Sequence, residues 1–563
     1  MRVLESGFLF ILLFNLLSWF QLPLLVVSSS SYEGPWYDYS AYTECKSYPE
    51  DPLYNGGIMK GNVEGNFGNH LMETVSYSPA FLLENLTATT RYTFSCWVKI
   101  NGINYSSSLV KARLSIDDSK LECIGTVIAR SDCWSFLKGG FVLDSPSKTS
   151  LLFFESVEEN STDILISSAS LQPFTVEQWE MHQQNSIRLK RKRMVAVHVS
   201  DDKGNQISGA SILIQQLSKD FPFGSAIAKT IIGNSAYQDW FIKRFNAAVF
   251  ENELKWYVTE KEQGNLNYSL ADQMLEFVRA NQILVRGHNI FWEDPQYTPK
   301  WVLDLSGQEL KSAVDSRIQS LMSRYKGEFV HWDVNNEMLH FDFYEQRLGS
   351  DASLNFFQTA QQEDPLATLF MNDFNVVETC DDKNSSVDSY ILRLRELIEG
   401  GAILDGIGLE GHFTRPNIPF MRAVIDKLAT LNLPIWLTEI DISKKMDQQT
   451  QATYLEEVLR EGFSHPSING IMLWTALHPN GCYQMCLTDN NFKNLPTGDV
   501  VDKLLQEWQT NQTGGVTNEH GLYSFNGFLG EYKISVSFGN KSTVTTFSLP
   551  QGEETKHLNI QLY

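Results

Sequence analysis

Between residues 223 and 508, short apolar runs alternate with longer segments in which apolar residues recur at helical spacing. Three of the helical segments cover residues 270–281, 307–325 and 449–461. Eight apolar runs are interpreted as buried strands, at 223–228, 246–250, 283–288, 329–335, 368–372, 405–410, 433–438 and 468–474. Strands that alternate with helices form parallel sheets, so this pattern predicts an α/β domain, a (β/α)8 TIM barrel over residues 219–514.

The segments on either side of the barrel have many short strand-like runs separated by polar residues. Residues 32–177 contain such runs at 91–98, 109–116 and 150–154. This spacing predicts an N-terminal β-sandwich module.

Two outer segments, 194–218 and 515–563, resemble the halves of a small transthyretin-like β-sandwich. The resemblance is carried by Gly209-Ala210, by Gly521-Leu522-Tyr523-Ser524-Phe525 and by Gly530-Glu531-Tyr532. It implies one small C-terminal β-domain that is split by insertion of the barrel, since the termini of a domain often lie close together. The alternative is an edge hairpin on the barrel followed by an unrelated β-module.

Residues 1–30 have the features of a secretory signal peptide, with Arg2 near the start, an apolar stretch at 8–27 and serines after it. The stretch is also long enough to remain uncleaved as a membrane anchor. The seven Asn-x-Ser/Thr sequons fit an exported glycoprotein. Residues 178–193 end in a basic run, which predicts a solvated linker in an exported chain and a nuclear signal in a cytosolic one.

Composition and charge narrow the functional classes. A formal net charge of −22 argues against nucleic-acid binding, because phosphate contacts need Lys and Arg. Seven cysteines cannot all pair within one chain. We predict a Cys482–Cys486 disulfide, whereas Cys380 has no evident partner. The pairing among the first four cysteines is left open: Cys45, Cys96, Cys123 and Cys133.

Two predicted strands end on a glutamate, Glu337 after the fourth and Glu439 after the seventh. In a (β/α)8 barrel the carboxyl ends of the strands surround the active site. One glutamate at the rim is commonly structural, but two on strands that face each other across the mouth favour a catalytic pair. Cleavage of a glycosidic bond needs two such carboxyl groups.

At this point the chain resembles glycoside hydrolase family 10, the retaining endo-β-1,4-xylanases. The motifs that carry the resemblance follow one another in family order: Glu251-Asn252-Glu253-Leu254-Lys255-Trp256, Arg286-Gly287-His288, Trp332-Asp333-Val334-Asn335-Asn336-Glu337, Asn372-Asp373-Phe374-Asn375, Gly406-Ile407-Gly408-Leu409-Glu410-Gly411-His412-Phe413 and Thr438-Glu439-Ile440-Asp441. Residues 481–489 resemble the plant members in particular. Residues 32–177 resemble a family 22 carbohydrate-binding module in their placement and strand pattern.

The resemblance implies a role for each matching residue. Glu337 would be the general acid/base and Glu439 the nucleophile, with their carboxyl groups about 5–5.5 Å apart as retention requires. Asp441 would support the network that orients Glu439. The residues implied to bind substrate are Glu251, Asn252, Lys255, His288, Trp292, Asn336, Glu410, His412 and Trp474.

The sequence departs from the family pattern at several places. Glu410 stands where the family usually has Gln, Glu293 where it usually has His, and Phe374 where it usually has Tyr. The later Trp of the last loop is not evident around residues 480–484. Two extra carboxyl groups in a crowded site should be costly unless one is protonated or paired. A protonated Glu410 could still donate the hydrogen bond of an amide, which predicts a working range shifted to acidic pH.

We therefore expect a secreted, monomeric protein of the plant cell wall that hydrolyses xylan by double displacement. The resemblance implies no cofactor, and Glu337-Met338-Leu339-His340 lacks the second His of a zinc-binding helix, so no metal is expected. After signal cleavage no membrane association is expected. The alternatives are a xylan transglycosylase and a catalytically weak xylan-binding wall protein.

Overall fold

The computed structural model describes residues 32, 34–54, 79–101, 106–117, 120–156 and 163–563. The predicted signal peptide, residues 1–30, lies outside these residues. The described residues from 38 to 563 form one compact unit, and those before residue 38 belong to another, in which the rings of Tyr32 and Trp36 are 4.7 Å apart. Among the described residues, no helix combines the length and the apolar character needed to cross a membrane.

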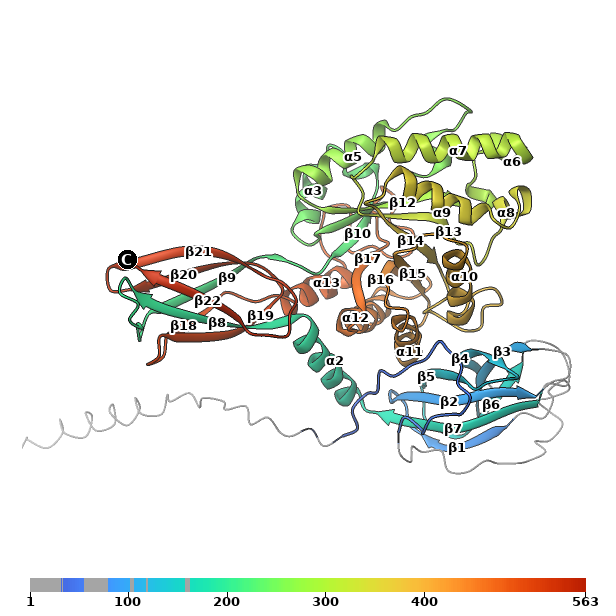
Figure 1. Ribbon diagram of the computed structural model, residues 1–563, viewed down its shortest axis with the longest axis horizontal. Coiled ribbons are helices and arrows are strands. Elements are labelled where there is room, and N and C mark those ends of the chain that lie inside the picture. The colour runs from blue at the N-terminus through green and yellow to red at the C-terminus, as the bar shows by residue number, and fades with distance from the viewer. Residues whose placement is uncertain (1–31, 33, 55–78, 102–105, 118–119, 157–162) are drawn as a thin grey trace, which may run out of the picture. The chain divides into compact units, whose positions relative to one another are not determined.

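Eight parallel strands form a closed barrel in chain order, as the sequence pattern predicts (Figure 1). They are β10 (Phe223–Ile227), β11 (Ala247–Phe250), β12 (Leu284–Trp292), β13 (His331–Asn336), β14 (Thr368–Asp373), β15 (Gly406–Phe413), β16 (Ile435–Ile442) and β17 (Ile468–Leu473). Strands β12, β15 and β16 run past their predicted carboxyl ends. Their extra residues include Trp292, His412 and Glu439, which belong to the candidate site.

Helices surround the barrel on the outside (Figure 1). They are α3 (Ser235–Ile242), α4 (Trp256–Thr259), α5 (Ser269–Ala280), α6 (Lys300–Leu303), α7 (Gly307–Arg324), α8 (Phe343–Leu348), α9 (Ala352–Glu363), α10 (Val387–Glu399), α11 (Ile418–Ala429), α12 (Gln448–Ser464) and α13 (Pro496–Glu507), with 3-10 turns at η1 (Lys229–Ile231) and η2 (Pro295–Tyr297). Polar side chains cap the first turns of several helices. The Asp447 carboxylate, for example, accepts the backbone N–H groups of Gln449 and Thr450 at the first turn of α12.

Two antiparallel sheets precede the barrel and enclose a common apolar core. One sheet contains β1 (Ala80–Leu86), β6 (Ser147–Ser156), β3 (Ser107–Ile116) and β4 (Lys120–Arg130), and the other β5 (Ser135–Val142), β2 (Arg91–Asn101) and β7 (Asp163–Phe174). Disulfides join Cys45 to Cys133 and Cys123 to Cys380. Cys380 thus has a partner that the sequence does not reveal, while Cys96 is a buried free thiol.

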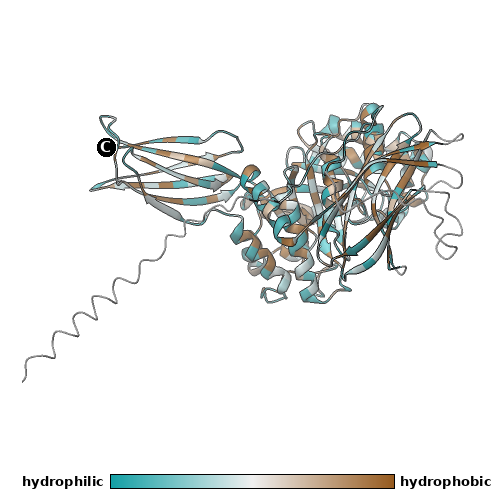
Figure 2. Ribbon diagram, turned by 90° about the horizontal axis from the view of Figure 1, so that it is seen from below, coloured by the Kyte–Doolittle hydropathy of each residue, from teal (hydrophilic) through white to brown (hydrophobic). Residues whose placement is uncertain are grey.

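The strands just before the barrel share sheets with the strands that follow it. Strand β8 (Lys192–Asp201) lies between β19 (Leu522–Phe528) and β22 (Lys556–Leu562). The second sheet has the order β18 (Thr513–Val516), β9 (Ser211–Lys219), β20 (Gly530–Phe538) and β21 (Lys541–Leu549). Apolar and polar residues alternate along these strands (Figure 2), and the apolar set packs between the two sheets.

The basic segment that predicts a solvated linker is instead a helix, α2 (Val176–Lys190), packed against the barrel. Trp179 Nε1 and Gln183 Nε2 both donate to one carboxylate oxygen of Glu461, at 2.9 Å each. The Arg191 guanidinium donates to three backbone carbonyls between residues 463 and 468. The expectation of a solvated hinge is therefore wrong, because one face of α2 is buried and bonded to α12, with Trp179, His182, Gln183, Ser186 and Ile187 as its buried residues.

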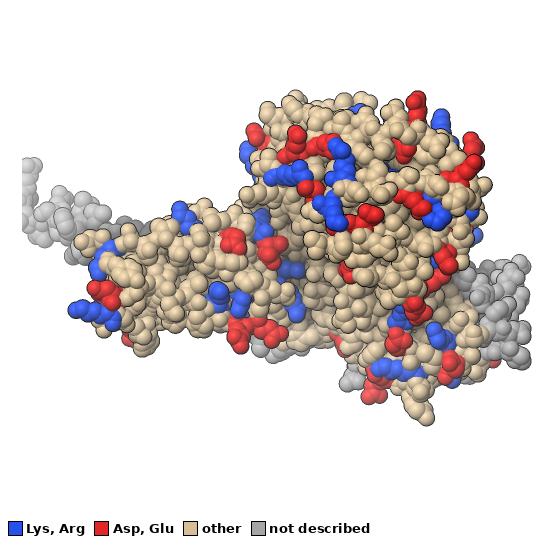
Figure 3. Space-filling view, turned by 45° about the horizontal axis from the view of Figure 1, so that its top comes forward, with Lys and Arg blue, Asp and Glu red and all other residues tan. Residues whose placement is uncertain are grey.

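The excess of acidic residues does not gather in one patch on the face drawn in Figure 3, where Lys and Arg lie among Asp and Glu. Several of these groups are exposed ion pairs, such as Lys311 with Asp315 at 2.7 Å. Such pairs contribute little to stability. The carboxyl groups that matter most for chemistry are buried, and they lie at the mouth of the barrel.

Candidate active site

The predicted site residues all lie at the carboxyl ends of barrel strands or in the loops directly after them. Glu337 follows β13 directly, with a left-handed backbone (φ 61°) and an N–H that donates to the Asn372 carbonyl at 3.0 Å. Glu410 and Glu439 are partners in the parallel register of β15 and β16. Left-handed backbone conformations of non-glycine residues, such as that of Glu337, are concentrated at functional sites.

Asn372, at the carboxyl end of β14, connects three of the predicted site residues. Its side-chain amide nitrogen lies 2.9 Å from Asn336 Oδ1 and 3.0 Å from one carboxylate oxygen each of Glu410 and Glu439. Its oxygen accepts from Thr438 Oγ1 at 2.5 Å. The sequence places Asn372 in a motif, but the motif alone assigns it no role.

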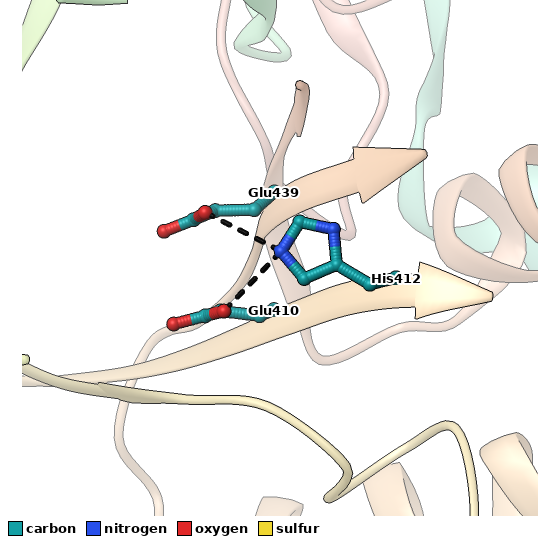
Figure 4. A group of neighbouring side chains, drawn as sticks. All are labelled: Glu410, His412 and Glu439. Atoms are coloured by element: carbon teal, nitrogen blue, oxygen red, sulfur yellow. Dashed lines mark ion pairs between the residues drawn. The ribbon is translucent and has the colours of Figure 1, made fainter. Parts of the chain in front are cut away.

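His412 lies between Glu410 and Glu439, as Figure 4 shows. Its Nε2 is 3.3 Å from Glu410 Oε2 and 3.5 Å from Glu439 Oε2, and its Nδ1 is 3.0 Å from Asp441 Oδ1. Burial lowers the pKa of His412, but the surrounding carboxylates, above all Asp441, raise it well above its usual value. An imidazolium at this place supplies a positive charge that holds Glu439 ionised.

The two predicted catalytic carboxyl groups have pKa values displaced in opposite directions. Burial, together with the charges of Asp373 and Glu439, raises the pKa of Glu337 to about 8. Burial also acts to raise the pKa of Glu439, but the attraction of His288, His412 and Lys255 outweighs it and lowers that pKa to about 2. One carboxyl group is therefore protonated and the other ionised near neutral pH.

Trp292 and Trp474 form walls beside these carboxyl groups. The Trp292 indole N–H donates to Glu337 Oε2 at 2.7 Å, and its ring stacks on Tyr297 with centroids 3.9 Å apart. The ring of Trp474 meets His288 edge-on at 5.1 Å, and His288 Nδ1 lies 2.9 Å from Asp333 Oδ2. Aromatic faces and fixed polar groups of this kind are typical of ligand sites.

Glu251, Asn252 and Lys255 form a second polar group in the loop after β11. Asn252 Nδ2 donates to Glu251 Oε2 at 3.0 Å, and Lys255 Nζ is 3.3 Å from Asn252 Oδ1 and 4.4 Å from the centre of the Trp292 ring. His478 Nε2 lies 2.5 Å from Glu251 Oε2. No motif identifies His478, because it lies in an irregular loop after β17.

Glu293 does not belong to this site, contrary to the sequence-based expectation. It is fully buried, and its two carboxylate oxygens accept from Asn335 Nδ2 at 2.7 Å and from the Tyr344 N–H at 3.0 Å. Successive residues of a strand point to opposite sides, so Trp292 and Asn336 face the site while Glu293 and Asn335 face away. Burial raises the pKa of Glu293 to about 7.

The predicted Cys482–Cys486 disulfide is present, and it closes a short loop at the mouth of the barrel. This loop holds Tyr483, whose side chain is 56% exposed and whose ring centroid lies 6.2 Å from that of His412. Tyr483 is thus the aromatic residue of the last loop, where a Trp is missing. The sequence does not predict the contact between Tyr483 and His412, because neither the missing Trp nor the Cys482–Cys486 spacing indicates it.

Glu410, His412 and Glu439 are spaced closely enough to share a cation, because their donor atoms lie within 4.8 Å of one another. A metal would require a neutral His412 and an ionised Glu410. The raised pKa values of both groups oppose this, so the arrangement favours proton sharing. His340 pairs with Asp373 at 2.6 Å and Asp382 at 3.2 Å rather than with Glu337, which leaves Glu337-x-x-His340 without a shared ligand position.

The family model described as "Glycosyl hydrolase family 10" matches residues 213–494. "Endo-1,4-beta-xylanase 5" of Arabidopsis thaliana is 37% identical over 477 residues, which cover 82% of this chain and 82% of that protein. "Endo-1,4-beta-xylanase 4" of Arabidopsis thaliana is 34% identical over 564 residues and 96% of each chain. A relative of different name, "Anti-sigma-I factor RsgI6" of Acetivibrio thermocellus, is 37% identical over 388 residues, 68% of this chain and 50% of its own length.

Proposed function

Because the chain belongs to glycosyl hydrolase family 10, we propose that it is an endo-1,4-β-xylanase, which hydrolyses β-1,4-xylosidic linkages inside xylan chains. The names of both Arabidopsis relatives support xylan as the substrate. The observation that carries the proposal is the pair Glu337 and Glu439, with pKa values of about 8 and about 2. Cleavage of a glycosidic bond requires one protonated and one ionised carboxyl group.

We propose a retaining mechanism with two displacements. In the first, Glu439 attacks the anomeric carbon while Glu337 gives its proton to the departing glycosidic oxygen, which leaves a glycosyl-enzyme ester. In the second, Glu337 takes a proton from water, the hydroxide attacks the anomeric carbon, and Glu439 is released. Because the Trp292 N–H donates to Glu337 Oε2, we assign the transferable proton to Oε1.

The surrounding residues support the charge changes of these steps. Asn372 lies against one oxygen of Glu439 and His412 near the other, which fixes the orientation of the nucleophile. Asn336 would bind the 2-hydroxyl of the reacting sugar, a contact that strengthens in the transition state. Glu251, Asn252, Lys255 and His288 would bind hydroxyl groups of the sugars on the non-reducing side.

We also propose that the chain is exported to the cell wall and that the N-terminal sandwich binds xylan. Export is supported by the three disulfides, since disulfides persist mainly in oxidising compartments. The sandwich is supported as a binding module only by its two-sheet architecture and its place before the barrel.

The activity is tested by incubating the protein with xylan and comparing it with Glu439→Ala and Glu337→Gln. We expect the wild type to release new reducing ends, and both variants to lose at least about a thousandfold in kcat/KM. Proton NMR of the first products should show the β-anomer, as retention requires. Redistribution of chain lengths without new reducing ends would indicate a transglycosylase, and equal inactivity of all three proteins would indicate a binding protein.

A further inference from the structure

A groove of about 580 Å³ is lined by the loop that follows β11 and by helices α6 and α7, which follow β12. Trp301, Leu266 and Leu305 form its apolar part, and Gln263, Gln308 and Ser312 belong to its polar part. We propose that this groove binds a distal segment of the same neutral polysaccharide chain whose glycosidic bond is cleaved in the active site. The proposal rests on the xylanase function and extends it to a preference for long chains.

Trp301 is the fixed aromatic surface of the groove. Its indole N–H donates to the Glu260 carbonyl at 3.0 Å, and its ring meets that of Trp256 edge-on at 5.7 Å. These contacts hold the ring in one orientation before any ligand binds, so little side-chain entropy is lost on binding. A rigid, half-buried indole that lines a groove suits the C–H face of a pyranose ring.

Apart from Glu260 and Glu309, the polar side chains of the groove are neutral donors and acceptors. Gln263, Gln308, Ser312 and Ser316 are exposed and offer amide and hydroxyl groups. Among the described residues that line the groove, none is Lys or Arg. The Glu260 carboxylate already accepts from Trp256 Nε1 and the Gly264 N–H, at 2.8 Å each. This chemistry favours a neutral polyhydroxyl chain over an anionic polymer, which would require cations.

A short series of contacts connects the groove to the active site. Trp256, which packs against Trp301, directly follows Lys255 in the chain. Lys255 Nζ lies 4.4 Å from the centre of the Trp292 ring, and Trp292 donates to Glu337. The loop after β11 thus lines the groove with its later part and holds Glu251, Asn252 and Lys255, which are proposed to bind sugars on the non-reducing side. A ligand that fills both must be longer than one that fills the active site alone.

The proposal is tested by comparing Trp301→Leu with Trp301→Phe on soluble polymeric xylan and on xylotetraose. Trp301→Leu removes the ring, and we expect it to lower kcat/KM on the polymer about threefold while leaving kcat/KM on xylotetraose unchanged. Trp301→Phe keeps a ring and should retain most of the activity on the polymer. Equal effects on both substrates, or none on either, would overturn the proposal.

Binding is measured separately, by the retardation of the Glu439→Ala protein in native gels that contain soluble xylan. In the Glu439→Ala protein, the second substitution Trp301→Leu should reduce the retardation, and Trp301→Phe should not. This measurement needs no turnover, so it distinguishes the two proposals. If the wild type is inactive but Trp301→Leu still reduces the retardation of Glu439→Ala, the xylanase function is refuted and the groove is retained. If Trp301→Leu leaves the retardation of Glu439→Ala unchanged, the groove alone is refuted.

Discussion

At the scale of single residues, Glu410 adds a third carboxyl group to the pair that carries the proposed chemistry. It is opposite Glu439 in the strand register, and Asn372 and His412 contact both groups. Burial and the charges of Glu439 and Glu337 raise the pKa of Glu410 well above its usual value. In the active form three carboxyl groups therefore hold two protons, and their titration belongs to the group as a whole.

This sharing predicts that Glu410→Gln extends activity to higher pH. In the wild type either of two protons can leave as the pH rises, whereas in the variant only the Glu337 proton can. The alkaline limb of kcat/KM against pH should therefore move upward by about half a unit. The matched control is Glu293→Gln, which neutralises a buried carboxyl group that has no contact with this cluster, and it should leave the limb in place. An unmoved limb in Glu410→Gln would refute the proton-sharing account.

The difference between Glu410 and Glu293 also marks what the sequence can predict about a site. The motifs place Glu337 and Glu439 at strand ends, because an apolar run that stops on a glutamate is visible in the chain. Both unusual glutamates lie one or two residues from recognised site positions, yet one enters the cluster and the other faces the helices. That outcome depends on which side of a strand each residue occupies, and on strand ends that periodicity does not locate.

At the scale of secondary-structure elements, the eight strands could be predicted but the loops between them could not. Buried strands are continuous apolar runs, so their existence is encoded locally. The loop at residues 374–386 is determined by partners far away in the chain. Cys380 is bonded to Cys123 of β4, and Lys111 Nζ donates to the Cys380 carbonyl at 2.9 Å. No local pattern predicts these contacts, because they need the sandwich beside the barrel.

The disulfide to this loop is expected to affect the active site as well as stability. The loop carries Glu378, whose carboxylate accepts the backbone N–H of His412 at 3.2 Å, and the His412 ring contacts Glu439. The double variant Cys123→Ser/Cys380→Ser should lose about 2–4 kcal/mol of unfolding free energy and several-fold in kcat/KM. The variant Cys45→Ser/Cys133→Ser should lose stability without a change in kcat/KM. That disulfide joins the sandwich to the chain segment before its first strand and has no bond to the barrel. Equal kinetic effects in the two variants would contradict a specific link to His412.

At the scale of the whole molecule, segments that are distant in the sequence are joined by buried polar contacts. Strands β8 and β9 pair with strands that follow the barrel, and the sequence pattern alone leaves this pairing as one of two interpretations. The contact between the sandwich and the barrel is equally non-local. Lys138 of β5 donates to Asp426 of α11 at 2.6 Å, with both side chains almost fully buried. His465 Nε2 lies 2.9 Å from the other oxygen of Asp426.

This buried pair predicts a pH-dependent loss of stability in Lys138→Met. Burial acts to raise the pKa of Asp426, but the charge of Lys138 and the contact with His465 outweigh it and lower that pKa. Removing Lys138 leaves a buried carboxylate short of a partner and should cost about 3 kcal/mol of unfolding free energy at pH 7. The pKa of Asp426 in the folded variant should then rise above its unfolded value. Acidification from pH 7 to 4 therefore protonates Asp426 in the variant and should narrow its difference from the wild type.

The measurement is urea unfolding followed by tryptophan fluorescence at both pH values. Lys311→Met is the control, because Lys311 and Asp315 form an exposed pair with side chains 58% and 52% accessible. That variant should stay within about 0.5 kcal/mol of the wild type. The double variant Lys138→Met/Asp426→Asn should regain part of the lost stability at pH 7, since it removes the buried charge from which Lys138 has been taken away. A loss in Lys138→Met that is the same at both pH values would show that packing of the lysine stem, and not the charge of Asp426, stabilises the contact between the sandwich and the barrel.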